Sequence, residues 1–310
     1  MTPTHTSTAV STPTPTPMAA PITTASTHAP MPSTRARQRK IMQFVRTPKG
    51  SVLIALALLG GIAAAGAGWR ETLPAALGIT LFAALMDVAL ARIVRHAWVF
   101  PSGALVTGLI IALVLDPHER WYVSAVAVAV AIGSKYAVRA RRGHIFNPAV
   151  LGLLVVSLLF ASEQSWWGSL PDLAAPVLLT LVIAGYLIGD RVNKLPMVLV
   201  FAGTYCAVFT AVALVGDPVR VAEMFRPPFV NAMLFFAFFM LSDPPTSPSR
   251  YRDQVIYGLI VGAVSIAVYL IIGGLTYLLV GLLVGNIYEA WRRTTAGRAN
   301  ERRRQANWGK

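Results

Sequence analysis

Apolar runs alternate along this chain with short polar connections, and most of the basic residues lie in those connections. A helix needs about 20 apolar residues to cross the hydrocarbon core of a bilayer, and most of the runs approach that length. The pattern predicts ten helical crossings, at 51–69, 73–92, 103–115, 121–138, 146–161, 171–189, 196–215, 231–241, 255–272 and 275–291. We therefore expect an all-α polytopic membrane protein.

Two of the runs are too short to cross a bilayer alone. The first is Gly103–Leu115, which follows Pro101 and ends at Asp116-Pro117. The second is Asn231–Leu241, which ends at Ser242-Asp243-Pro244-Pro245. Short segments interrupted by Gly or Pro, in matching positions of two halves, point to a binding site at the interface between repeats. We interpret both as half-helices that border such a site.

Clusters of Lys and Arg follow alternate crossings, and such clusters mark the cytoplasmic side of a membrane. Applied connection by connection, the rule gives five crossings at 51–161 that begin inside and five at 171–291 that begin outside. The third crossing of each set is the short one, which is the pattern of an inverted-topology repeat. The expected location is the inner (plasma) membrane, multi-pass, with both termini in the cytoplasm.

The composition agrees with a membrane protein. Of 310 residues, 55% are hydrophobic and 13% are charged, whereas soluble domains carry about 25% charged residues. The formal net charge of +14 does not indicate nucleic acid, because the cations lie in short clusters between apolar runs. The lone cysteine, Cys206, rules out an intrachain disulfide and a cluster held by several thiolates, and we expect it to pack in the core.

The ends of the chain and one loop have distinct compositions. Residues 1–34 are rich in Thr and Pro and predict a disordered tail without a signal peptide. A basic juxtamembrane segment follows at 35–50, and a basic cytoplasmic tail is expected at 292–310. The outer connection contains Trp166 and Trp167, which suit an interfacial aromatic belt.

Asp87 lies within the second crossing. A carboxylate inside a membrane helix is costly and marks a functional position such as an ion pathway. The alternative is a structural ion pair with Arg92 or Lys135 near the cytoplasmic end.

The half-helices and their surroundings supply the other candidate residues. Asp116 and Asp243 either form part of a site or simply decorate a helix end before Pro. The small and hydroxylated residues that include Gly108 either line a site or serve helix packing. Asn147 has a similar alternative as an N-cap before Pro148. The candidate site residues are Ser102, Gly103, Thr107, Asp116, Asn147, Ser242, Asp243 and Thr246.

No nucleotide-binding glycine loop, paired-histidine metal motif or nucleophile triad is visible in the sequence. A metal site and catalysis of the soluble-enzyme type are therefore not expected.

Three motifs resemble the NqrB/RnfD family, the membrane subunits of the sodium-pumping NADH:quinone oxidoreductase and of the Rnf electron-transport complex. They are Ser-Gly-Ala-Leu-Val-Thr-Gly at 102–108, Phe-Asn-Pro-Ala at 146–149, and Phe-Met-Leu-Ser-Asp-Pro-Pro-Thr-Ser-Pro at 239–248, the last leading to Ile-Tyr-Gly at 256–258. The resemblance covers about residues 45–292. It implies ten helices in two inverted halves, related to urea transporters, and an acidic residue at the position of Asp87.

The resemblance also implies electron transfer through a flavin, FMN or riboflavin, coupled in the full complexes to ion movement. It further implies partners among other membrane or flavoprotein subunits, and a quinone. Family members attach FMN to a Thr of a Ser-Gly-Ala-Thr motif on the outer side, but the corresponding residues 161–170 of this chain contain no Thr. The expectation is thus a non-covalent flavin in a reduced or orphan member.

A second interpretation remains open on the sequence alone. The same fold without a redox role would be a solute or ion permeation protein, because a fold does not fix a function.

Overall fold

The computed structural model describes residues 43–140, 143–171, 173–216 and 218–308. The predictions for the tail at 1–34 and for most of the basic segment at 35–50 lie outside the described residues. Every element below belongs to one compact unit, at 41–310.

The described chain is built from helices, which confirms the predicted all-α class. Each of the ten apolar runs forms one: α2 (Pro48–Ala67), α3 (Trp69–Arg95), α4 (Ser102–Val114), α5 (Trp121–Ala137), α6 (Pro148–Phe160), α7 (Ala175–Arg191), α8 (Leu195–Val215), α10 (Phe229–Phe235) continued by η3 (Phe236–Leu241), α11 (Tyr251–Ile272) and α12 (Tyr277–Trp308). By length and composition, α2, α3, α8 and α11 can each cross a membrane alone.

Short elements connect these helices. A two-stranded antiparallel ladder, β1 (Arg139–Ala140) with β2 (Gly143–His144), links α5 to α6. The outer connection contains η1 (Trp167–Ser169), and α9 (Pro218–Ala222) with η2 (Glu223–Phe225) leads into α10.

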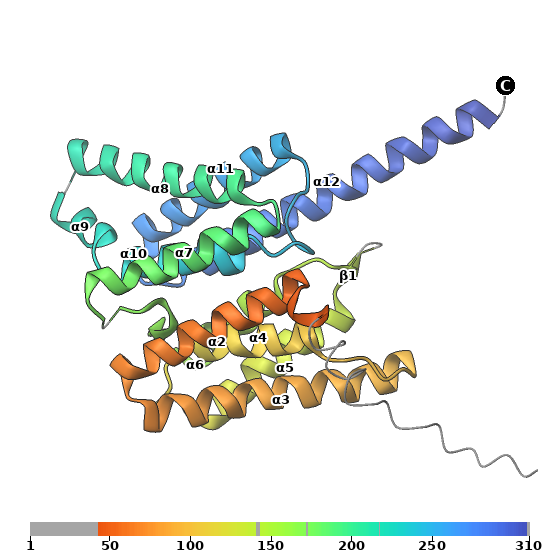
Figure 1. Cartoon of the computed structure of the whole chain (residues 1–310). Helices are drawn as coiled ribbons and strands as arrows, with labels where there is room; N and C mark the ends of the chain where they lie inside the picture. The colour runs from red at the N-terminus through yellow and green to blue at the C-terminus, as the bar shows by residue number, and fades with distance from the viewer. Residues whose placement is uncertain (1–42, 141–142, 172, 217, 309–310) are drawn as a thin grey trace, which may run out of the picture. The chain divides into compact units, whose positions relative to one another are not determined.

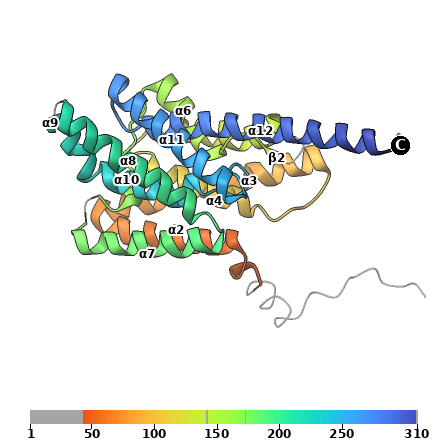
Figure 2. The same cartoon turned by 90° about the horizontal axis from the view of Figure 1, so that it is seen from above.

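The helices of each half pack mainly among themselves: α4 lies against α2 and α3, and α11 lies against α8 and α12. Contacts between the halves include α2 with α7 and α6 with α12. Figures 1 and 2 both show α2 running alongside α7. The two half-helices are thereby held between the halves rather than at the lipid surface.

Helix α12 is longer than the predicted crossing at 275–291, because the basic tail continues the helix to Trp308. The tail residues Ala, Arg, Glu and Gln favour helix, and no Pro interrupts them.

The second half-helix changes geometry along its length. After Phe235 the backbone widens into a π-helical turn over Phe236–Leu241, a form that occurs mostly as a single turn at functional sites. The turn brings Phe238 against α7 where Gly185 leaves room, since a Cβ at Gly185 would lie 2.3 Å from the Phe238 ring. Apolar periodicity alone does not distinguish this turn from an α-helix.

The prediction of an aromatic belt at Trp166 and Trp167 is wrong, because both side chains are buried inside the protein. Their loop folds beneath the end of α4, where the last carbonyl groups of a helix lack intrahelical partners. The Trp167 Nε1 donates to the Ala112 carbonyl at 2.7 Å, and the Trp166 amide donates to that of Val114 at 3.0 Å. The two tryptophans thus supply hydrogen-bond donors to two carbonyl groups near the end of a broken helix.

Cys206 also differs from expectation. Its side chain is exposed on α8 and not packed in the core. In a protein that crosses a membrane, an exposed apolar position on a helix of this length faces lipid.

Candidate functional site

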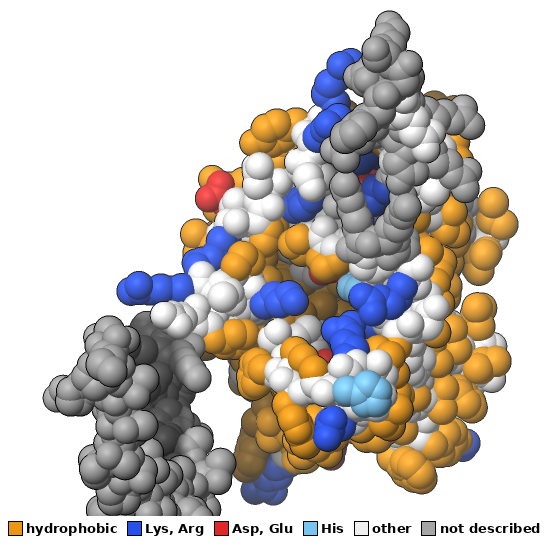
Figure 3. Space-filling model, turned by 90° about the vertical axis from the view of Figure 1, so that its right-hand side faces the viewer, with side chains coloured by type: hydrophobic (Ala, Val, Ile, Leu, Met, Phe, Trp, Pro, Cys, Tyr) orange, Lys and Arg blue, Asp and Glu red, His pale blue; other side chains and the backbone are white. Residues whose placement is uncertain are grey.

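A cavity of about 790 Å³ lies between the two halves at one end of the helix bundle. The first residues of α2 and α4 and the last residues of α3 and α5 form much of its wall, and the loop after η3 closes the opposite side. Figure 3 looks onto this end and shows Lys and Arg side chains around a hollow.

Most of the candidate residues meet at this cavity. They come from both halves and from segments far apart in the sequence: Asp87, Ser102, Gly103, Thr107, Asn147, Ser242 and Asp243. Thr246 lies just behind the wall, where its buried hydroxyl donates to the Asp243 carboxylate at 3.0 Å. The two half-helix motifs, which are about 140 residues apart in the sequence, thus contribute to one site.

Asp116 lies elsewhere. It follows the far end of α4, where its carboxylate accepts a hydrogen bond from the His118 amide at 2.8 Å and contacts the His118 ring at 3.1 Å. The other ring nitrogen of His118 lies 2.6 Å from the Glu71 carboxylate. Hydrogen bonding to Glu71 and then to Asp116 raises the pKa of His118 above its ordinary value. The position of Asp116 matches its alternative interpretation as a group that decorates a helix end.

Asp87 forms an ion pair with Lys135, which is the alternative to a functional role that the sequence left open. The Lys135 ammonium lies 3.8 Å from the Asp87 carboxylate, and the Tyr136 hydroxyl donates to that carboxylate at 3.1 Å. Both partners also line the cavity. Asp87 is therefore a paired charge that borders the site.

Of the serine, threonine and glycine residues of α4, some line the cavity and one allows close helix packing. Gly103 and Thr107 face the cavity, and the Thr107 hydroxyl donates to the Gly103 carbonyl at 2.8 Å. Gly108 faces α3 instead, where a Cβ would lie 2.8 Å from that of Ala83. One face of α4 lines the cavity while the other allows close helix packing.

Asn147 connects the two halves and also caps α6. Its side-chain oxygen accepts from the Val150 amide at 3.3 Å, as expected of an N-cap before Pro148. Its Nδ2 donates to the Met240 carbonyl at 3.1 Å, and its backbone amide donates to Asn286 at 2.8 Å. The end of the second half-helix thereby gains a partner that lipid could not provide.

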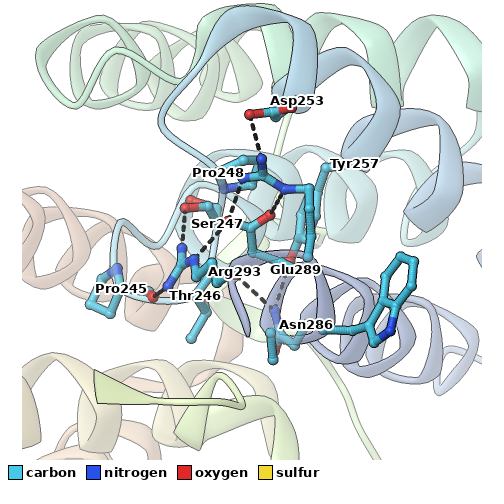
Figure 4. A network of polar contacts seen from close by, with 12 residues as sticks. Pro245, Thr246, Ser247, Pro248, Asp253, Tyr257, Asn286, Glu289 and Arg293 are labelled. Carbon is cyan, nitrogen blue, oxygen red and sulfur yellow. Dashed lines mark hydrogen bonds and ion pairs between the residues drawn. The ribbon is translucent and has the colours of Figure 1, made fainter. Parts of the chain in front are cut away.

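A polar network from α12 holds the loop after η3 (Figure 4). The Arg293 guanidinium donates to the carbonyl groups of Pro245 and Ser247, both at 2.8 Å. The buried Glu289 carboxylate accepts from the same guanidinium at 2.7 Å. Nearby, Asn286 donates to the Tyr257 hydroxyl at 2.7 Å. Each polar group in this buried network has a partner, which fixes the loop that carries Asp243.

The sequence interpretation missed the Asn286, Glu289 and Arg293 network. Asn286 and Glu289 lie within the last predicted crossing, at 275–291, where polar residues are uncommon. That signal could have identified them.

Lys194, which precedes α8, also supports this loop. Its buried ammonium donates to the carbonyl groups of Ser247 and Pro248. Burial, reinforced by the positive charge of Arg293, lowers its pKa to about 8. The loop after η3 is therefore fixed by two cations that bind its backbone.

These features define a polytopic all-α membrane protein with a cavity between two half-helices, lined by apolar residues and several polar and charged groups. The chain belongs to the NQR2, RnfD, RnfE family, whose model matches residues 27–177 and 173–289. The family predicted from the three motifs is therefore confirmed.

Two relatives illustrate the similarity, and both are named as subunits of an ion-translocating oxidoreductase complex. The relative from Ectopseudomonas mendocina (strain ymp) is 31% identical over 138 residues, which cover 42% of this chain and 39% of that protein. The relative from Pseudomonas aeruginosa (strain LESB58) is 36% identical over 74 residues, covering 24% and 21%. The matched stretches thus span at most about two fifths of these relatives.

Proposed function

We propose that this chain is a membrane subunit of an ion-translocating oxidoreductase complex and that it carries electrons through a non-covalently bound flavin. The observation that carries the proposal is the cavity of about 790 Å³ at which both half-helix motifs meet. Its size falls within the range of about 300–1,000 Å³ typical of ligand pockets. The names of the relatives support the assignment to such a complex.

The lining residues suit a flavin. Val106, Ile110 and Phe239 offer apolar surface to a planar ring, while Ser102 and Asn147 place hydroxyl and amide groups beside it. A few polar groups within an apolar wall are typical of cofactor sites. When bound, the flavin supplies the one- and two-electron chemistry, and the protein contributes binding, orientation and electrostatics.

We also propose that the two halves form an inverted repeat, and the contacts between them support this. In the predicted pairing, α2 corresponds to α7 and α6 to α12. Each of these helices contacts its own counterpart, as elements related by a two-fold axis do when they meet at that axis.

The proposal gives Asp87 a place beside an ion pathway coupled to electron transfer. Its carboxylate borders the cavity and its charge is balanced by Lys135. Other membrane or flavoprotein subunits, and a quinone as acceptor, are the partners that such a role requires.

Permeation of a solute or ion is the alternative that the fold allows. One feature supports electron transfer over permeation. The buried loop with Trp166 and Trp167 packs under the end of α4 that is far from the cavity. A permeation path would have to leave the half-helix at that end, and the loop occupies it. Purified protein tests the choice. Visible flavin absorption that bleaches on reduction supports the proposal, whereas colourless protein that conducts a solute in liposomes supports permeation.

The mode of attachment is tested on the same sample. Because residues 161–170 contain no Thr, the flavin should leave the protein on denaturation. A fluorescent protein band in a denaturing gel would contradict the non-covalent assignment.

A variant of Asp243 tests the location of the site. Asp243→Asn preserves the size and hydrogen-bonding capacity of the side chain while removing its charge at the cavity wall. We expect near-normal thermal stability with clearly lower flavin occupancy or electron-transfer rate. Asp190→Asn, at an exposed position at the end of α7, is the matched control. Equal redox behaviour of both variants and the parent would place the function elsewhere.

A further inference from the structure

A second pocket, of about 310 Å³, lies at the other end of α6 from the cavity, beside the turn from α11 to α12. We call it the outer pocket, since the predicted topology places this end outside. It is lined by residues 157, 162–164 and 274–276. We infer that the outer pocket binds the headgroup of a phospholipid of the phosphatidylethanolamine type. No residue of the cavity lines it, so the inference is independent of the proposed function.

Two turns of the chain form the wall of the outer pocket. Ala161, directly after α6, has a left-handed backbone with a φ of 49°, and the chain then folds back so that Gln164 bonds to Ser157. On the other side, Gly273 and Gly274 have φ values of 79° and 69°, which Gly adopts without strain. These glycines turn the chain from α11 into α12, and α12 packs against α6. The outer pocket is thus bounded by a segment of each half.

Two buried polar groups of this wall lack partners. Ser162 is 8% exposed, and its hydroxyl has no hydrogen bond within the part of the chain that the structure describes. The amide nitrogen of Gln164 donates to the Ser157 hydroxyl at 3.1 Å, whereas the buried amide oxygen has no partner there. Because a buried polar group without a partner is costly, such groups indicate that a bound molecule completes their hydrogen bonding.

The free groups of the wall are mainly acceptors. The exposed Glu163 carboxylate also lines the outer pocket, and its side chain has no hydrogen bond or ion pair within the described residues. A primary ammonium is a compact group with three N–H donors and no acceptor. The carboxylate of Glu163, the amide oxygen of Gln164 and the hydroxyl of Ser162 supply acceptors for it.

A metal ion fits the outer pocket less well. Ca²⁺ and Mg²⁺ require several oxygen ligands at about 2.0–2.6 Å, and a pocket of about 310 Å³ is much larger than such a shell. Among the described residues, no group of three or more His, Cys, Asp or Glu side chains could hold a metal ion. We therefore assign the pocket to an organic cation.

The same pocket has a place for a phosphate. Helix α12 begins at Tyr277, directly after the lining residue Thr276, so the positive end of this long helix lies beside the pocket. A helix N-terminus is a favourable position for a phosphate group. An ammonium near Glu163 and a phosphate near Thr276 together correspond to a phosphoethanolamine headgroup.

The surroundings of the outer pocket favour a lipid over a soluble amine. Leu158 and Leu159, at the end of α6, are exposed, and so are Ile271 and Ile272, at the end of α11. In a protein that crosses a membrane, exposed apolar side chains on such helices face lipid. Acyl chains attached to a headgroup in the pocket would therefore have apolar surface next to them.

Lipid binding to the delipidated protein in detergent tests the inference, with affinities measured by native mass spectrometry. Phosphatidylethanolamine should bind about tenfold or more tightly than phosphatidylcholine, because a quaternary ammonium has no N–H to donate. It should likewise bind more tightly than phosphatidylglycerol, which has no ammonium. Equal affinities for the three lipids would overturn the inference.

Paired variants locate the headgroup. Glu163→Gln removes the charge and should lower phosphatidylethanolamine affinity several-fold while leaving phosphatidylcholine affinity unchanged. Ser162→Ala removes an unpartnered hydroxyl, so it should not lower the melting temperature without lipid, yet it should weaken the preference for phosphatidylethanolamine. Glu223→Gln, which removes an exposed carboxylate outside the pocket, is the control and should change neither. A preference that survives in both pocket variants overturns the assignment.

Competition experiments separate the lipid from other occupants. Soluble phosphoethanolamine lacks acyl chains and should displace phosphatidylethanolamine only at a large excess. Displacement at equal concentration would assign the outer pocket to a soluble ligand and overturn the lipid assignment. Displacement by Ca²⁺ would assign it to a metal ion and would overturn the inference as well.

Discussion

At the scale of single residues, Lys194 is a buried cation whose ammonium donates hydrogen bonds to backbone carbonyl oxygens. Its pKa of about 8 in the folded protein is lower than the ordinary value of about 10.4. At a pH between these two pKa values, Lys194 is protonated in the unfolded chain but has released its proton in the folded protein. Folding is therefore disfavoured by this group below pH 8, and stability rises as the pH increases from 8 toward 10.

The expected observation is a rise in the melting temperature of the detergent-solubilised protein over that range. Lys194→Met removes the titrating group and should abolish the rise, while Lys49→Met, at an exposed position, should preserve it. A melting temperature that falls over this range in the parent, with no dependence on Lys194, would contradict the prediction.

His118 provides a second prediction at this scale. Its raised pKa arises first from Glu71 and then from Asp116. The contact of protonated His118 with Glu71 and Asp116 stabilises the folded state when the pH is below the pKa of His118 in the unfolded chain. This stabilisation is lost as the pH rises through the pKa of His118 in the folded protein. Glu71→Gln should lower the pKa of His118, measured by NMR titration of histidine-labelled protein with His118→Gln to assign the signal. No change in the titration would show that Glu71 does not hold the ring.

At the scale of helices, the contact between α3 and α4 depends on Gly108. In a helix, Ala replaces Gly with a gain of about 0.5–1 kcal/mol when space allows. At Gly108 the added Cβ would lie 2.9 Å from the Thr80 Cα, so overpacking of about 1–3 kcal/mol should dominate. A Cβ at Gly78 meets nothing within 4 Å. Gly108→Ala should lower the melting temperature and Gly78→Ala should not.

The bond from Asn147 to the second half-helix allows a matched pair of variants. Asn147→Ala removes both the cap of α6 and the donor to Met240, and should cost about 2 kcal/mol or more. Asn147→Ser retains a capping oxygen but cannot reach Met240, so its loss should be smaller yet measurable. Equal stability of the parent and the Ser variant would mean that the link between halves is not energetically important.

The helices could be predicted from the sequence because the thickness of the bilayer sets the length of the apolar run in each crossing. The two half-helices were also recognisable, since Pro and Gly mark their ends. The π-helical turn and the burial of Trp166 were not, because both arise from packing against distant segments, Gly185 and the end of α4. Cys206 was misassigned because hydrophobic periodicity within a membrane does not separate lipid-facing from core positions.

The site was predictable only in part, for a related reason. Repetition of the half-helix motif brought Ser102 and Asp243 to attention, and they line the same cavity. Asp116 shared the motif of Asp243 but lies at the opposite end of α4, since the repeats are predicted to run in opposite directions. The supporting groups Lys194 and Arg293 act through backbone carbonyls, and such contacts have no sequence pattern of their own.

At the scale of the whole molecule, the Lys and Arg pattern predicts that the cavity faces the cytoplasm. Single-cysteine labelling tests this in a background that lacks the exposed Cys206. Glu163→Cys should react with an impermeant reagent added to intact cells, and Ser249→Cys should react only after the cells are opened. Both positions are exposed. Equal labelling from outside would reject the proposed topology.

The direction in which the cavity opens also bears on how the protein matures. Under the predicted topology the mouth of the cavity faces the cytoplasm, so the flavin of the proposed function would enter from that side once the helices have assembled. Assembly of this chain would then depend on the cell's internal flavin supply alone.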